Sequence, residues 1–164
     1  MKALDLNQVN AHSSYKVWIS PNGKYVFETD YDILYAVDFE EDNNPYYKAY
    51  WFNLTNPEGQ KSPGDAKKGQ TVICIIEEFF RQNPDILLYM CSTDNGKQAQ
   101  RARLFLRWFN GYEQQQKYVI KSTEVKGEGR QEYVALIIQR THPLLDEVIA
   151  RFDDEISMFN DFKP

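Results

Sequence analysis

The chain has 164 residues, a length at which one domain can bury roughly 70% of its unfolded surface. Its composition is 42% hydrophobic and 26% charged, which is typical of a soluble protein, and 15% of the residues are aromatic. The formal net charge of -5 argues against general attraction to nucleic acid, because such affinity comes from accumulated cationic contacts. We therefore expect one domain and rank nucleic-acid binding as the weakest functional hypothesis.

The two cysteines, Cys74 and Cys91, are too few for a disulfide framework and lack the paired spacing of a zinc site. This usage favours a reducing compartment. No segment approaches the ~20 apolar residues that span a bilayer, and the first residues hold no apolar run of signal-peptide length. We expect a cytoplasmic protein with no membrane contact, no bound metal and no cofactor.

Alternating hydrophobicity predicts three consecutive strands in the first quarter of the chain. Residues 15–19 and 24–29 alternate on either side of Ser20-Pro21-Asn22-Gly23, the strongest hairpin signal in the sequence. After a short turn at 30–32, residues 33–39 alternate again. Short connections of this kind predict an antiparallel meander.

Residues 46–54 form a predicted fourth strand that is dense in aromatic rings. These rings can form a stacking surface for bases or sugars, or they can cover one end of the core. We favour the core, since aromatic residues are common in strands. The rings belong to Tyr46, Tyr47, Tyr50, Trp51 and Phe52.

A long helix is predicted after a loop, with Asp65 as its N-cap and Asn83-Pro84 as its stop. Cys74 and Ile75 widen the apolar face of this helix, and we assign Cys74 a packing role. The apolar positions recur at three- and four-residue spacing: Val72, Ile73, Ile76, Phe79 and Phe80.

The second half of the chain predicts a buried strand, a hairpin and a final helix. Residues 86–90 are apolar at every position, as in a central strand covered on both faces. Residues 117–125 and 131–140 form the hairpin, and its second arm is the natural neighbour of that strand. Thr141-His142-Pro143 caps the final helix, with Pro143 in its first turn.

The predicted fold class is α+β, a single domain over residues 1–164 in the order β-β-β-β-α-β-α-β-β-α. We expect a mainly antiparallel or mixed sheet of about six to seven strands with three helices. Residues 1–14 are expected to form a loose arm or a short cap, and residues 160–164 a frayed tail.

A resemblance spans most of the chain, from about Tyr15 to Phe152. It rests on the order of short motifs, among them Tyr25-Val26-Phe27-Glu28-Thr29-Asp30, Leu87-Leu88-Tyr89-Met90-Cys91 and Arg101-Ala102-Arg103-Leu104-Phe105. In this order the chain resembles a family of small uncharacterised bacterial proteins, a domain of unknown function. The resemblance implies no established activity and transfers no functional residue.

A catalytic hypothesis centres on the turn after the central strand. Cys91 at a strand end, followed by a turn with Ser92, Thr93 and Asn95, has the layout that lowers a cysteine pKa and binds an oxyanion. Cysteine-dependent phosphatases place an arginine at the sixth position after the nucleophile, where Lys97 stands here. Asp94 is better explained as a helix N-cap. This turn remains an alternative, as an anion site or a cysteine-dependent enzyme.

Neither of the two imidazoles, His12 and His142, has a recognisable partner spacing for catalysis. We assign both a structural or surface role.

The helix that follows the turn carries two apolar seams. One seam, predicted to face the sheet, contains Ala99, Ala102, Phe105, Leu106 and Phe109. The other contains Leu104 and Trp108 and is flanked by Gln100, Arg101 and Arg107, and Lys97 also lies off the first seam. This second seam either packs on the last helix, with arginines paired to Asp153, Asp154 and Glu155, or forms a partner surface.

From these features we expect a non-enzymatic binding or interaction module. Its surface would be Lys97, Arg101, Leu104, Arg107 and Trp108, and its partner another protein or a second copy of the chain. The hypotheses of an enzyme or anion site at the Cys91 turn, and of a weak nucleic-acid binder, stay open beside it.

Overall fold

The computed structural model describes residues 1–59, 63–91, 107, 109, 114–127 and 130–161. Within these ranges the helices are α1 (Leu6–His12), α2 (Ala66–Gln82), α4 (Gln114–Lys117) and α5 (Leu145–Asp161). The strands are β1 (Val17–Ile19), β2 (Tyr25–Glu28), β3 (Leu34–Glu41), β4 (Ala49–Thr55), β5 (Ile86–Cys91), β6 (Tyr118–Gly127) and β7 (Arg130–Gln139).

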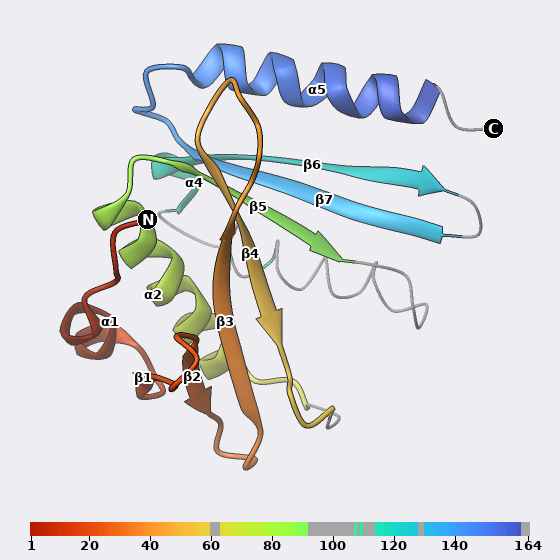
Figure 1. The fold of residues 1–164 in the computed structure, drawn as a ribbon. Helices are drawn as coiled ribbons and strands as arrows, with labels where there is room; N and C mark the ends of the chain where they lie inside the picture. Colours follow the sequence, from red (N-terminus) through yellow and green to blue (C-terminus); the bar gives the residue numbers. More distant parts are fainter. Residues whose placement is uncertain (60–62, 92–106, 108, 110–113, 128–129, 162–164) are drawn as a thin grey trace. The chain divides into compact units, whose positions relative to one another are not determined.

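The strands form one seven-stranded sheet in the order β1-β2-β3-β4-β5-β7-β6 (Figure 1). This confirms the predicted α+β class and the predicted order of strands and helices. The chain divides into two compact units, one of residues 1–40 with 52–84 and the other of residues 41–51 with 85–164. The expectation of a single domain over residues 1–164 stays a prediction.

The first unit contains the predicted meander. Strand β1 pairs with β2 and β2 with β3, both antiparallel. In the first turn Gly23 adopts a positive φ of 82° and donates its N-H to Ser20 O at 2.9 Å. Glycine adopts this conformation without the clash that a Cβ atom would cause, so the Asn22-Gly23 pair sets the hairpin here.

Helix α2 begins and ends where the sequence predicts. The Asp65 side chain accepts the N-H of Lys67 at 3.0 Å, and the helix ends at Asn83, before Pro84. Its buried face includes Phe79, whose ring stacks on Phe39 with 5.0 Å between centroids. The buried apolar side chains are those of Val72, Ile75, Ile76, Phe79 and Phe80, all predicted for this face, whereas Ile73 is half-buried.

Residues 1–14, for which we expected a loose arm or a short cap, contain helix α1. Asp5 caps this helix, and its N-H donates to Glu78 Oε2 of α2 at 2.9 Å. The Asn83 side chain accepts the N-H of Lys2 at 2.8 Å and donates to Lys2 O at 3.2 Å. Val9 is buried. Contacts with α2 therefore hold a helix too short for the periodicity of the sequence to reveal.

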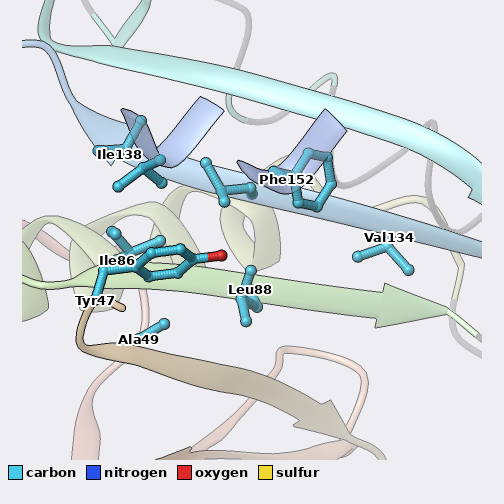
Figure 2. Close-up of a cluster of buried hydrophobic side chains, with 9 residues drawn as sticks. Tyr47, Ala49, Ile86, Leu88, Val134, Ile138 and Phe152 are labelled. Carbon is cyan, nitrogen blue, oxygen red and sulfur yellow. The ribbon is translucent and has the colours of Figure 1, made fainter. Parts of the chain in front are cut away.

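In the second unit the apolar strand β5 lies between β4 and β7, which confirms its predicted central position. It pairs antiparallel with β7, and β7 pairs antiparallel with β6. Helix α5 runs along β6 and β7 (Figure 1). Figure 2 shows Phe152 of α5 pointing toward the strands that carry Leu88 and Val134. The full cluster is Tyr47, Ala49, Ile86, Leu88, Val134, Leu136, Ile138, Val148 and Phe152.

Helix α5 starts later than predicted. Pro143, expected in its first turn, lies in the preceding turn, which the N-H of Leu145 closes by donating to His142 O at 3.2 Å. At its other end α5 extends to Asp161, so the tail expected from residue 160 begins inside the helix. Residues 162–164 lie outside the described ranges.

Candidate functional site

The predicted partner surface lies mostly outside the described residues. Of its five members Arg107 is described, and it is helical and exposed. Lys97, Arg101, Leu104 and Trp108 lie outside the described ranges. The partner surface therefore stays a prediction.

Phe109, the described residue nearest to Arg107, faces another way than Arg107 does. Phe109, two residues later, is fully buried, and its ring meets Tyr118 of β6 edge-on with 5.5 Å between centroids. Two residues correspond to about 200° around a helix. The segment therefore has a buried side at Phe109 and a solvent side at Arg107.

The predicted anion turn begins at the end of β5. Cys91 is the last residue of that strand, and its backbone is opposite Tyr133 of β7. Ser92, Thr93 and Asn95 lie outside the described residues. The hypothesis of an anion or cysteine site at this turn stays a prediction.

The other cysteine, Cys74, is half-buried on α2. Gln70 Nε2 lies 3.3 Å from its Sγ atom, within hydrogen-bonding distance. Burial, followed by the negative charge of Glu77, raises the pKa of Cys74 to about 11. The thiol consequently stays protonated near neutral pH, which suits packing and not nucleophilic attack.

Both imidazoles take part in local structure. His12 ends α1, and its carbonyl oxygen accepts Gln70 Nε2 at 2.7 Å. His142 Nδ1 accepts the N-H of Leu144 at 3.0 Å, just before α5. Burial lowers the pKa of His142, and the charge of Asp85 opposes that shift. These contacts support the structural roles expected from the sequence.

The aromatic strand lies mainly in the core, as we favoured. Three of its rings are buried, those of Tyr47, Tyr50 and Phe52, and Trp51 is half-buried. Tyr46 is 57% exposed, and the Arg151 guanidinium lies 3.6 Å from its ring centroid. These five rings therefore form no continuous stacking surface, because only the Tyr46 ring is exposed and the Arg151 guanidinium already lies over it.

A polar cluster joins the start of α2 to the meander. Tyr15 Oη donates to Asp65 Oδ2 at 2.7 Å and accepts the N-H of Asp30 at 3.3 Å. Lys67 Nζ binds Asp30 Oδ2 at 2.7 Å. Burial, followed by the hydrogen bond to Asp65, raises the pKa of Tyr15. The phenol is held protonated and fully engaged, so this cluster acts as a structural clamp.

A buried lysine lies one residue further along α2. Lys68 is only 8% exposed, and its Nζ atom lies 3.2 Å from Tyr35 Oη and 4.7 Å from the centroid of that ring. Of the polar cluster around Tyr15, the sequence predicted only Asp65, as a helix cap. The bonds among Tyr15, Asp30, Asp65 and Lys67 join positions 15 to 50 residues apart, which local sequence patterns do not reveal.

The acidic residues predicted as arginine partners lie on α5. One of them, Asp153, pairs with Lys121 of β6, with 3.6 Å between Nζ and Oδ2. Within the described ranges no three His, Cys, Asp or Glu side chains gather as a metal site would need. None of the helices in those ranges is long and apolar enough to cross a bilayer.

These features define an α+β protein with a mixed sheet and a clamped second helix. A family model described as "Family of unknown function (DUF6169)" matches residues 64–154, which is more than half of the chain, and the chain belongs to this family. The predicted resemblance to a family without an assigned activity is thereby confirmed. Neither the curated proteins nor the solved structures contain a match. The family range includes all of α2, the Cys91 turn and Arg107.

Proposed function

We propose that this protein is a non-enzymatic interaction module that binds a protein partner or a second copy of itself. Its binding surface would be the five residues predicted from the sequence, called here the arginine-tryptophan surface: Lys97, Arg101, Leu104, Arg107 and Trp108. Arginine and tryptophan are enriched among the residues that dominate binding energy at protein interfaces.

The observation that carries the proposal is the contrast between exposed Arg107 and buried Phe109. At about 100° per residue, a helix that buries Phe109 directs Arg107 to the opposite side. On the predicted helix, Leu104 and Lys97 then fall on the side of Arg107. Arg101 and Trp108 flank this side, which gives a mixed apolar and cationic patch.

Two further observations support binding in preference to chemistry. The Cys74 thiol, with its pKa raised to about 11, and His142, whose Nδ1 accepts a backbone N-H, both serve local structure. The Cys74 thiol is also free, which fits a reducing compartment. We extend the proposal to a cytoplasmic location and, from the resemblance, to a bacterial origin.

The test compares two double variants of the full chain. Trp108→Ala with Arg101→Glu removes the centre of the surface. Lys16→Glu with Trp18→Ala also reverses one positive charge and truncates one tryptophan, at exposed positions of the first unit where Trp18 is 39% exposed. Sedimentation velocity measures self-association, and quantitative capture from the native lysate measures partner binding.

We expect the first double variant to lose at least about tenfold in partner capture or in self-association, since a hot-spot side chain contributes 2 kcal/mol or more, on the order of thirtyfold. The control should bind like the wild type. Circular dichroism and thermal melting check that both variants remain folded. Equal binding by the two double variants would refute the proposed surface.

A further inference from the structure

The corner between β7 and α5 is closed by one residue, His142. Its N-H donates to Gln139 O at 3.0 Å, and its carbonyl oxygen accepts the N-H of Leu145 at 3.2 Å. Its side chain adds a third bond, in which Nδ1 accepts the N-H of Leu144 at 3.0 Å. The first N-H groups of a helix have no partner within the helix, so this imidazole supplies one at the entrance to α5.

An imidazole can accept a hydrogen bond at Nδ1 only while that nitrogen carries no proton, because both ring nitrogens are donors in the charged form. Histidine is also the side chain whose ordinary pKa, about 6.5, lies within the range of pH 5 to 8. We propose that His142 is a pH-sensitive latch that holds the first turn of α5 when neutral and releases it when protonated.

The charges around the latch act in both directions. Asp85, the residue before β5, favours the protonated ring. The positive end of the helix dipole opposes protonation. Asp146 and Glu147 lie in the first turn of α5, and Arg140 stands two residues before His142 in the sequence.

Burial is the largest effect, and it lowers the pKa of His142 from its ordinary value. A lowered pKa in the folded state means that folding favours the neutral ring. The stabilisation is therefore present above the ordinary pKa of histidine, and it is lost as the pH falls through the lowered value. The latch is closed near neutral pH and opens in mild acid.

Release would act on a small part of the core. Val148 is 1% exposed and donates its N-H to Leu144 O at 2.9 Å, in the turn that the latch secures. Further along α5, Phe152 and the pair between Lys121 and Asp153 continue to hold the helix to the strands. We therefore expect loosening confined to the start of α5.

The test uses two variants that separate charge from hydrogen bonding. His142→Asn keeps a side-chain acceptor that can reach the N-H two residues on, but it does not titrate. His142→Ala removes the acceptor at every pH. Nuclear magnetic resonance follows the ring nitrogens and the solvent-exchange rate of the Leu144 N-H from pH 8 to pH 5, corrected for its intrinsic pH dependence.

In the wild type, protection of the Leu144 N-H should fall about fivefold as His142 titrates, the factor for losing one typical hydrogen bond. It should stay constant in His142→Asn and be low throughout in His142→Ala. His12→Asn, which removes the other imidazole, should reproduce the wild-type profile. The proposal is overturned if protection of the Leu144 N-H in His142→Asn falls with pH as in the wild type. It is also overturned if Nδ1 carries the proton in the neutral wild-type ring. If His142→Ala does not fold, the comparison with His142→Asn decides alone.

Discussion

Buried polar residues in the first unit are held by bonds that connect separate elements. Thr71 Oγ1 accepts the N-H of Tyr15 at 3.1 Å and donates to Lys67 O at 2.8 Å. Thr29 Oγ1 accepts the N-H of Tyr31 at 3.2 Å within the turn between β2 and β3. A buried polar group left without a partner costs about 1–3 kcal/mol. The bond from Tyr15 to Thr71 therefore helps to fix the segment before β1 on α2, and the other two stabilise their own turn and helix.

At the same scale, the two thiols should differ in reactivity. Cys91→Ser leaves Cys74, whose pKa is raised to about 11, and Cys74→Ser leaves Cys91. If the protein is non-enzymatic, Cys91 should titrate with an ordinary thiol pKa of about 8.5. At pH 7 the reaction of Cys74 with a small thiol probe should then be slower by roughly two orders of magnitude, because the thiolate is the reactive form.

The measurement is the rate of probe labelling against pH for each single variant, with the unfolded chain in denaturant as the reference. A Cys91 that labels rapidly below pH 7 would contradict the non-enzymatic proposal and favour chemistry at its turn. A Cys74 that labels like the reference would contradict its burial.

At the scale of elements, the sequence predicted those whose signals are local. Each of these signals lies in or next to the element that it predicts: the Asn22-Gly23 turn in the first hairpin, the Asp65 cap at the start of α2 and the apolar run in β5. Helix α1 was missed because bonds to residues more than 70 positions away hold it. Helix α5 starts later than predicted because residues 142–145 form a turn that the N-H of Leu145 closes by donating to His142 O.

In the candidate site, too, the sequence predicted the features with a local signal and missed those that depend on distant residues. Periodicity placed Phe109 on a buried face, and the structure confirms that burial. It could not reveal the clamp of Tyr15 with Asp65 and Asp30, because the clamp depends on tertiary contacts among three elements. A tyrosine that anchors a helix start has the same local sequence as one that faces solvent.

A variant of Glu78 tests how α1 is held. Glu78 is fully buried and accepts three bonds, from the N-H of Asp5 at 2.9 Å, from Gln82 Nε2 at 3.0 Å and from Arg81. Glu78→Ala should lower the free energy of unfolding by about 1–3 kcal/mol, because the N-H of Asp5 loses its acceptor. It should also speed proteolysis within residues 1–14.

Glu58→Ala removes an exposed carboxylate in the same unit and should leave both quantities unchanged. Urea denaturation gives the stability, and limited proteolysis with mass spectrometry locates the cuts. If residues 1–14 are cut no faster in Glu78→Ala than in the control, the bond to Asp5 does not hold α1 in place.

At the scale of the whole molecule, the expectation of one domain rests on β4. Ala49–Trp51 of this strand belong to the second unit and Phe52–Thr55 to the first. Each unit has its own aromatic packing, with Phe79 on Phe39 in the first and Phe152 in the cluster of the second. A strand cannot lose order in one half without weakening the other, so we predict that the two units unfold in a single cooperative transition.

Phe79→Leu and Phe152→Leu test this coupling, since each is a change in the core of one unit that should cost about 1–2 kcal/mol. Hydrogen exchange under mild denaturant can follow Val26 in β2 and Leu136 in β7 separately. For a single domain, either variant lowers the protection of both amides by the same factor, and Asp154→Ala, at an exposed position of α5, lowers neither. If each variant affects only the amide of its own unit, the chain consists of two domains joined through β4.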